Sequence, residues 1–405
     1  MKILHVVTGF PYDYSGGITN YVRALVDAQI KLGFDVSVLA GIGGNEYDYV
    51  YQMKSTKINP FSLKLEVEDT IYEQDVLTLL KKFDLIHFHM VIDFPSNLLL
   101  MISKEIKKYV ISLHDYFLIC PRIFMSDYQN KICHLIDVKK CNNCCGVLDR
   151  NDFLRKISNK IGVALPRIIN NTPEIRLGKI KKFVENAKLI FPVSNKVCEI
   201  YNNIIPSNNY IVNHIGNITS NMPIPSKVKQ DGKVIVGLLG TLSYIKGAEV
   251  LVNILSLLKK DNINNLEFHF YGRADKKWLD KLVSLGLIYK GTYTQNDLIN
   301  VVSSIDIGFV SPIWEDNAPQ VVMEFLNLGT PVIGSRRGGI TDFIEHMVNG
   351  YLFEPTDSFE FNEMIAWLKN ITLDDVSKLA DGIHKLKTPE QHAREIVQYY
   401  GTIKD

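Results

Sequence analysis

Short apolar runs alternate with segments of helical periodicity along most of the chain. This alternation predicts βαβ units and a parallel α/β sheet. Residues 318–328 are one of the expected helices. The strands expected in the first half are KILHVV (2–7), DVSVLA (35–40), DLIHFH (84–89), YVISLH (109–114) and LIFPVS (189–194).

A polar, proline-bearing stretch at residues 216–233 interrupts the pattern and predicts a linker. The alternation then restarts, so we expect an α/β fold with two doubly wound domains and a cleft between them. The second set of expected strands is VIVGLLG (234–240), LEFHFYG (266–272), IDIGFVS (305–311), TPVIGS (330–335) and GYLFEP (350–355). The expected domains are 1–220, with a Cys-rich insertion at 120–145, then 221–385, and a C-terminal helix at 386–405 that packs back on the first domain.

Composition narrows the class of protein. A chain of 405 residues with 46% hydrophobic and 22% charged residues is long for one core and suggests two domains. Lys and Arg (45) nearly balance Asp and Glu (44), so no global field points to nucleic acid. The first apolar run breaks at Gly9 and Pro11, unlike a signal peptide, and no apolar stretch approaches the ~18 residues of a membrane span. We therefore expect a soluble, cytoplasmic protein whose six cysteines are reduced.

Ligands of doubly wound sheets bind at the carboxyl ends of the strands. After the first strand, Gly16 and Gly17 precede a helix, where backbone N–H groups suit a phosphate; a plain tight turn explains the pair equally well. In the second half, Lys246 precedes Gly247 at a helix start and could hold a diphosphate, or it could be solvated surface. Neither turn has the spacing of a dinucleotide fingerprint or a P-loop.

The stretch WEDNAPQVVME (314–324) carries two acids around an expected helix start. Pro319 fits the first helical turn and Asn317 is a plausible N-cap. Asp316 and Glu324 are eight positions apart, about 12 Å along a helix, which suits two acids that bind hydroxyls at opposite ends of a polyol ligand. A capping Asp and a solvated Glu are the alternative, but Glu324 falls within an apolar run, where an unpaired charge is costly.

These motifs, in this order, resemble the GT-B retaining glycosyltransferases of family 4. The resemblance covers most of the chain. It rests on the glycine pair, on LHD (113–115), FPVS (191–194), GTLSYIKG (240–247) and DNAPQVVME (316–324), and on LGTPVIGSRRGGITDFIEHMVNGYLFEP (328–355). It implies the GT-B fold, with two Rossmann-like domains facing across a cleft. The implied activity is transfer of a sugar from a UDP- or GDP-sugar to an acceptor hydroxyl, with retained configuration, in polysaccharide or glycolipid assembly.

The resemblance also implies roles for individual residues. Gly16 and Gly17 would approach the donor, His114 would lie near the anomeric carbon, and Lys246 would neutralise the diphosphate. Asp316 would bind sugar hydroxyls, the N–H groups of Asn317 and Ala318 would lie near the sugar and phosphate, and Glu324 would hold the ribose. Two positions depart from the family pattern, since relatives usually carry Glu at position 316 and many carry Arg in place of Thr241.

No Asp-x-Asp pair occurs in the sequence, so no cofactor is expected to be required for catalysis. The two departures leave room for a catalytically idle sugar-nucleotide-binding protein. A nucleotide-sugar epimerase of the same fold is a further alternative within enzymes. Release of nucleotide diphosphate from a panel of UDP- and GDP-sugars would discriminate among the three.

Five cysteines are concentrated between residues 120 and 145. Cys120, Cys133, Cys141 and Cys144 have 12, 7 and 2 residues between successive members, and the last pair forms a C-x-x-C knuckle of the kind that binds zinc. Cys145 could replace Cys144, and His134 is a reserve ligand. We expect a structural Zn; reduced, unliganded thiols are the alternative.

Residues 150–182 are strongly basic, with nine Lys or Arg residues against two acids. Apolar residues recur there at helical spacing, as in helices that lie on anionic membranes. Docking on the inner face of a membrane to reach a lipid-linked acceptor is one interpretation, and an ordinary domain helix with a solvated face is the other. The basic residues are Arg150, Arg155, Lys156, Lys160, Arg167, Arg176, Lys179, Lys181 and Lys182.

Overall fold

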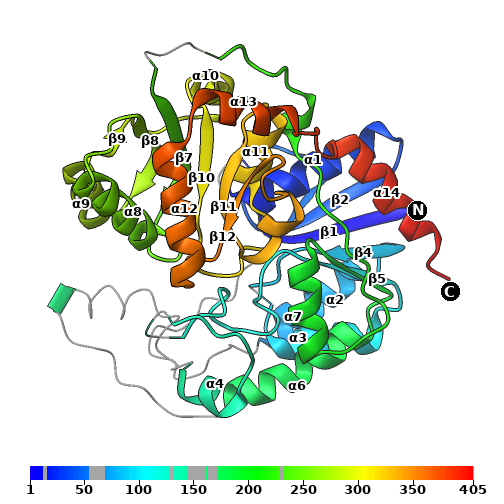
Figure 1. Cartoon of the computed structure of the whole chain (residues 1–405). Helices are drawn as coiled ribbons and strands as arrows, with labels where there is room; N and C mark the ends of the chain where they lie inside the picture. Colours follow the sequence, from blue (N-terminus) through cyan, green and yellow to red (C-terminus); the bar gives the residue numbers. More distant parts are fainter. Residues whose placement is uncertain are drawn as a thin grey trace. The chain divides into compact units, whose positions relative to one another are not determined.

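The protein is described by a computed structural model that covers residues 1–11, 16–53, 69–92, 94–127, 129, 131–144, 160–161, 171–227 and 232–404. The chain forms two compact units. Unit 1 comprises residues 1–214 and 390–405, and unit 2 comprises residues 215–389. Each unit contains a six-stranded sheet whose paired strands are all parallel (Figure 1). The expected architecture of two parallel α/β sheets is confirmed.

The sheet of unit 1 has the strand order β3-β2-β1-β4-β5-β6. The first three strands are added toward one edge of the sheet and the last three toward the other, so the order reverses between β1 and β4. Such a reversal opens a ligand-binding crevice at the carboxyl ends of the strands. The strands are β1 (Lys2–Gly9), β2 (Asp35–Ile42), β3 (Val50–Gln52), β4 (Leu85–Phe88), β5 (Tyr109–Leu113) and β6 (Leu189–Pro192). The helices are α1 (Gly17–Lys31), α2 (Thr70–Leu80), α3 (Ser96–Glu105), α4 (Val138–Cys144), α6 (Thr172–Glu185), α7 (Asn195–Ile204) and α14 (Pro389–Gly401).

Helix α14, red in Figure 1, returns from the end of the chain to pack within unit 1. The hydroxyl of Tyr21 on α1 lies 2.7 Å from Nε2 of His392, and Nδ1 of His87 on β4 lies 2.6 Å from the hydroxyl of Tyr400. All four side chains are buried. The last helix therefore closes part of the core of the first sheet.

The sheet of unit 2 repeats the same topology, with the order β12-β11-β10-β7-β8-β9. Its reversal lies between β7 and β10. The strands are β7 (Val234–Leu242), β8 (Leu266–Ala274), β9 (Ile288–Tyr289), β10 (Ile307–Val310), β11 (Val332–Ser335) and β12 (Gly350–Phe353). The helices are α8 (Ala248–Lys260), α9 (Lys276–Ser284), α10 (Leu298–Ser303), α11 (Gln320–Asn327), α12 (Ser358–Asn370) and α13 (Leu373–Asp381), with 3₁₀ turns η1 (Ile218–Asn221), η2 (Gln295–Asp297) and η3 (Gly338–Asp342).

Of the strands that the structure describes, sequence periodicity located the ten with four or more residues but missed β3 and β9. These two are edge strands of three and two residues, too short to show an apolar pattern. The predicted linker at 216–233 is wrong in its first part, because η1 belongs to unit 2 and buries Thr219. The amide of Asn217 donates to the carbonyl of Lys387 at 3.1 Å, which attaches this segment to the end of the same unit.

The start of α11 also differs from the expectation. The helix begins at Gln320, and Pro319 is its N-cap with an extended backbone (φ −69°, ψ 100°). Asn317 is therefore not the cap, and Pro319 is not within the first turn. The physical reason is that the Asn317 side chain is buried instead of turning back to the helix N–H groups.

Most of the basic segment at 150–182 lies outside the described residues. Its described end, α6, packs as an ordinary domain helix that buries Ile180 and Phe183. Arg176 is only 2% exposed, donates to the carbonyl of Phe117 at 2.8 Å, and so does not belong to a basic surface. In the ranges that the structure describes, no helix combines the length and apolar character that a membrane crossing needs.

Candidate functional site

The turn after β7 presents Lys246 at the carboxyl edge of the second sheet. Gly247 is the N-cap of α8 and has φ +91°, a conformation that favours glycine. A Cβ at Gly247 would lie 2.0 Å from the carbonyl oxygen of Ser311, so this turn touches the segment that follows β10. The expected position of Lys246 at a helix start is confirmed, and glycine is required there by packing.

The loop after β10 carries Asp316 and is attached to η3. The amide of Gly339 donates to the carbonyl of Asp316 at 2.7 Å. Gly338 has φ +53°, and a Cβ there would lie 1.9 Å from the same carbonyl oxygen. The preceding Glu315 accepts from the amide of Gly338 at 2.6 Å and pairs with Arg337 at 3.3 Å. The backbone at Asp316 is therefore fixed from both sides.

Lys246 and Asp316 meet although they are far apart in sequence. Nζ of Lys246 lies 2.6 Å from Oδ2 of Asp316 and 5.2 Å from the ring centroid of Trp314. The Lys246 side chain remains 39% exposed, so an anion could reach it from solvent. The carboxylate of Asp316 holds the ammonium at the edge of the sheet, and an anionic ligand would compete for it.

Asn317 and Ala318 supply unused hydrogen-bonding groups next to this pair. Asn317 is 2% exposed, yet neither its side-chain oxygen nor its nitrogen has a partner within the described ranges. The backbone N–H groups of Asn317 and Ala318 also donate to no residue that the structure describes. Buried amides are nearly always hydrogen-bonded, so these groups indicate a position that a polar ligand fills.

Glu324 lies about one turn into α11, where the neighbouring Met323 and Phe325 are buried. Burial raises the pKa of Glu324 to about 7. Its carboxyl group makes no hydrogen bond or ion pair with the part of the chain that the structure describes. Tyr293 lies near enough that Glu324, after burial, contributes to a raised tyrosine pKa. Glu324 is thus neither a capping residue nor a solvated one.

Thr241 lies near the end of β7, at a position that the sequence analysis marks as a departure from the family pattern. It pairs in register with Arg273 on β8, and both side chains are exposed. Paired residues of parallel strands are close neighbours. Arg273 makes no ion pair or hydrogen bond with any described residue. A guanidinium thus stands beside Thr241 at the same edge, and sequence reasoning had not identified it.

In unit 1, Gly16 and Gly17 open helix α1. Gly16 is extended, with φ −172°, which any residue can adopt. A Cβ there would come no closer than 3.9 Å to another described atom, that of Thr19 Oγ1. Neither the backbone conformation nor the described neighbours require glycine at position 16. The amide of Gly16 donates to Oγ1 of Thr19 at 2.9 Å.

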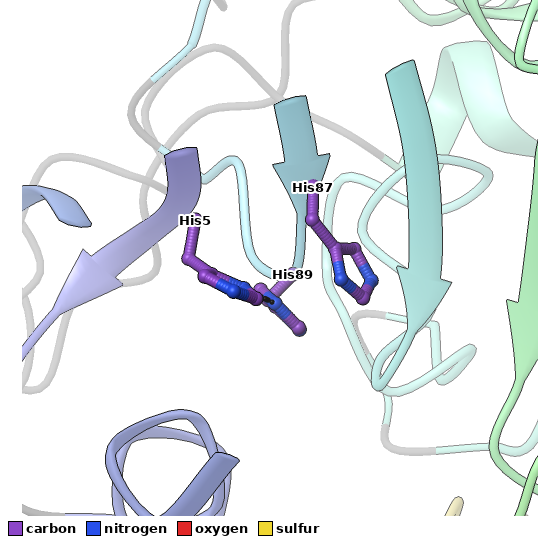
Figure 2. Close-up of side chains that lie close together, drawn as sticks. All are labelled: His5, His87 and His89. Atoms are coloured by element: carbon purple, nitrogen blue, oxygen red, sulfur yellow. Dashed lines mark hydrogen bonds between the residues drawn. The ribbon is translucent and has the colours of Figure 1, made fainter. Parts of the chain in front are cut away.

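His114 follows β5 and is part of a buried group of histidines. Burial lowers its pKa to about 3, so it is neutral at physiological pH. Its Nε2 lies 3.1 Å from Nδ1 of His89. His5 on β1 and His87 on β4 are register partners, and Figure 2 shows their rings close to that of His89. Sequence reasoning identified His114 but not the other three.

A signal for the missed histidines exists in the sequence. His5 and His87 occupy the middle of two apolar strands, and they are register partners on β1 and β4. Polar side chains in strands that are covered on both faces are unusual. Because residues two apart share a face, His87 and His89 could have been placed together.

Among the described residues, His5, His87 and His89 are grouped closely enough to be considered as metal ligands. One nitrogen atom from each ring lies within 4.8 Å of those from the other two. Both nitrogens of each ring already have hydrogen-bond partners, however. His5 contacts His89 and Gln29, His87 contacts Tyr400 and Ser112, and His89 contacts His5 and His114. A metal ion would have to displace these bonds, so the arrangement favours a hydrogen-bond network.

The four predicted zinc ligands are all described, but no three of their sulfur atoms meet the same 4.8 Å criterion. The thiols still lie near one another. Burial, followed by the neighbouring thiols of Cys120, Cys144 and Cys133, raises the pKa of Cys141 to about 12. Cys145 lies outside the described residues. Zinc binding by these cysteines stays a prediction.

Comparison with known proteins gives a consistent assignment. The family model "Glycosyltransferase Family 4" matches residues 15–138, and "Glycosyl transferases group 1" matches residues 223–393. An uncharacterized glycosyltransferase of Methanocaldococcus jannaschii is 24% identical over an alignment of 424 positions, gaps included. The alignment covers 99% of this chain and 98% of that protein. The chain belongs to the family 4, group 1 glycosyltransferases.

Comparison with solved structures identifies the fold of this glycosyltransferase. Anabaena HepE in complex with UDP and glucose matches with a TM-score of 0.64 and 14% identity over 100% of both chains. The lipopolysaccharide outer core galactosyltransferase WaaB, in its apo form, matches with a TM-score of 0.63 and 12% identity over 100% of both chains. These likenesses establish the GT-B fold of the glycosyltransferase.

Proposed function

We propose that this glycosyltransferase transfers a sugar from a nucleotide diphosphate sugar to an acceptor hydroxyl with retention of configuration. The observation that carries the proposal is the group of unsatisfied polar atoms at the carboxyl edge of the second sheet. The buried amide of Asn317 and the carboxyl group of Glu324 have no partner within the described ranges, and they flank the start of one helix. Lys246 stands at the same edge as a solvent-accessible cation.

Each group suits one part of such a donor. The carboxyl group of Glu324 would accept hydrogen bonds from the two ribose hydroxyls, because a half-buried acid without a partner among the described residues gains from such donors. The N–H groups of Asn317 and Ala318, with Lys246, would bind the diphosphate. Asp316 would orient the sugar while it holds Lys246. In unit 1, His114 and the N-terminus of α1 at Gly16 and Gly17 would contact sugar hydroxyls.

The chemical step breaks the bond between the anomeric carbon and the diphosphate oxygen. The electron pair leaves on the diphosphate, the acceptor oxygen forms the new bond to the anomeric carbon, and the acceptor proton is released. The protein's main contribution is to stabilise charge on the leaving diphosphate by fixed donors, a term often worth about 3 to 4 kcal/mol per group. Lys246 and the N-terminus of α8 supply such donors, and the proposal requires no metal ion at this edge.

Arg273 is our candidate for the second phosphate cation. It neighbours Thr241 in the sheet and lacks a partner within the described ranges, whereas Arg337 is occupied by Glu315 and Glu354. A guanidinium on β8 would replace one that relatives carry on β7. Arg273→Ala should therefore weaken nucleotide diphosphate binding more than nucleoside monophosphate binding, whereas equal effects on both would exclude this role.

For the acceptor we propose a saccharide or lipid-linked saccharide of cell-surface polysaccharide or glycolipid assembly, with a hexose as the transferred sugar. The support is analogy with the lipopolysaccharide galactosyltransferase named above. We also propose a cytoplasmic location, at most peripheral on the inner face of a membrane. A structural Zn on Cys120, Cys133, Cys141 and Cys144 is part of the same proposal.

The test is a panel of UDP- and GDP-sugars, with nucleotide diphosphate release measured with and without acceptor extracts. Release that depends on acceptor supports a transferase. Binding without turnover on any donor would favour the idle sugar-nucleotide-binding alternative. Conversion of the donor into another nucleotide sugar, with no acceptor consumed, would favour an epimerase.

A further inference from the structure

A continuous row of buried hydrogen bonds runs through unit 1 to His114. Oε1 of Gln29 on α1 lies 2.8 Å from Nε2 of His5, and Nδ1 of His5 lies 2.8 Å from Nε2 of His89. Nδ1 of His89 then lies 3.1 Å from Nε2 of His114. All four side chains are buried, and Figure 2 shows the rings of His5 and His89 directed toward one another. We call Gln29, His5, His89 and His114 the histidine row.

The rings in this row are neutral at physiological pH. Burial lowers the pKa of His5 to about 4 and that of His114 to about 3, and it lowers the pKa of His89 well below its usual value. A neutral imidazole has one N–H donor and one acceptor nitrogen. Each ring in the row must therefore donate at one nitrogen and accept at the other.

This constraint gives the row a single direction. Oε1 of Gln29 can only accept, so Nε2–H of His5 donates to it. Nδ1 of His5 then accepts from Nε2–H of His89, and Nδ1 of His89 accepts from Nε2–H of His114. Nδ1 of His114 is left without a hydrogen atom, and it has no partner among the residues described here. The orientation of one amide on α1 thus sets the tautomer of a ring at the carboxyl end of β5.

A second set of hydrogen bonds runs beside it through His87, and its Tyr400 also interacts with Gln29. His87 lies 2.7 Å from Oγ of Ser112 and 2.6 Å from the hydroxyl of Tyr400. It makes no hydrogen bond to the histidine row, although its ring lies 3.9 Å from that of His89, centroid to centroid. The bond to Ser112 provides a control in the same core, because breaking it removes a buried hydrogen bond of His87 without interrupting the path from Gln29 to His114.

We propose that Gln29, His5 and His89 are positioning residues that hold His114 in its Nε2–H tautomer, so that Nδ1 accepts a hydrogen bond from a substrate hydroxyl. The proposal rests on the proposed function for the identity of that hydroxyl, which would belong to a sugar. A hydroxyl is the matching group because it can donate, whereas a phosphate oxygen or a deprotonated acid would meet a lone pair. In the opposite tautomer, His114 would present an N–H and repel the same donor.

The first measurement needs no substrate. Nitrogen-15 NMR of histidine-labelled full-length protein distinguishes the protonated from the unprotonated ring nitrogen, with His114 assigned by His114→Gln. We expect a single tautomer with the hydrogen atom on Nε2. Gln29→Met removes the amide at similar length and should give a mixture of tautomers, whereas Ser112→Ala should leave the His114 tautomer unchanged.

A hydrogen atom on Nδ1 of His114 in the wild-type protein would overturn the proposal, even if Gln29→Met failed to fold. So would equal changes in the two variants, or a Gln29→Met protein whose tautomer is unaltered. Because no donor is present, these results are independent of whether the donor panel succeeds. Once a donor is known, Gln29→Met should lower kcat about twofold if the tautomers equalise, and far more if the wrong tautomer dominates.

Discussion

Acidification from pH 7 to about 5.5 should destabilise unit 1 strongly and unit 2 little. The perturbed groups are the four buried histidines His5, His87, His89 and His114, whose pKa values burial lowers. Each binds a proton in the unfolded chain near pH 6.5 but, in the folded unit, only at much lower pH, about 4 for His5 and about 3 for His114. The stability that neutral histidines permit is therefore complete above pH 6.5 and is lost progressively below it.

The size of the loss follows from the proton linkage. Between pH 7 and about 5.5, each such histidine lowers the free energy of unfolding by about 1.3 kcal/mol, or about 5 kcal/mol for four. Asp115 acts in the opposite direction, because burial raises its pKa to about 6. Its protonation in the folded unit returns about 0.8 kcal/mol. The net loss of about 4 kcal/mol is a large part of the 5 to 15 kcal/mol that typically stabilises a domain.

Unit 2 is the internal control in this experiment. Burial lowers the pKa of His269 in unit 2, but Glu324, whose raised pKa of about 7 makes the folded unit favour acid, opposes this effect, so the stability of unit 2 should change little in the same range. Pulsed hydrogen exchange with mass spectrometry across a urea gradient reads each unit from its own peptides, those of β1, β4 and β5 against those of β7 and β10. An unchanged urea midpoint for unit 1, or equal losses in both units, would refute the reasoning.

Further predictions concern the donor site, the cysteines and the basic segment. Glu324→Gln should weaken donor binding roughly 10- to 150-fold with little change in turnover, because a charged hydrogen bond far from the reacting carbon is lost. Asp316→Asn should mainly lower turnover, and Asp316→Glu should raise or lower activity according to the donor sugar; identical behaviour of the two acids would contradict their separate roles. Nucleotide binding near pH 7 should release protons, since ribose hydroxyls favour the carboxylate form of Glu324, and calorimetry in buffers of different ionisation enthalpy measures this release. Protein purified without chelator should contain one Zn per chain, and elemental analysis that finds none would exclude the zinc site. Co-sedimentation with anionic vesicles that weakens with salt would support membrane docking by residues 150–182, whereas indifference to lipid charge would end the idea.

The sequence was sufficient for the longer strands and for the position of Lys246 at a helix start, because both depend on local patterns. Buried parallel strands are apolar runs, and the turn at Lys246 and Gly247 follows directly from its glycine. Short edge strands such as β3 lack enough residues to show a pattern. The predicted start of α11 was wrong because Asn317 is not its N-cap. The side chain of Asn317 is buried, and this burial depends on the surrounding loops and not on a local sequence pattern.

The remaining differences concern contacts between distant segments. The pairing of Lys246 with Asp316 joins residues 70 positions apart, and Arg273 becomes relevant only through its register with Thr241. The histidine row joins α1, β1, the end of β4 and the end of β5, so its hydrogen bonds cannot be read from spacing. Arg176 counted as part of a basic segment in the sequence, but in the fold it is buried against Phe117.

The central claim is that the carboxyl edge of the second sheet binds a nucleotide sugar and stabilises its leaving diphosphate through Lys246. The most direct test is the rate of nucleotide diphosphate release from the best donor of the panel, compared among wild type, Lys246→Ala and Lys233→Ala. Lys233 precedes the same strand at its opposite end and pairs with Glu267 at 2.8 Å. The account predicts that Lys246→Ala lowers turnover about 100- to 1,000-fold while Lys233→Ala is close to wild type. Release at the wild-type rate by a folded Lys246→Ala protein would contradict it.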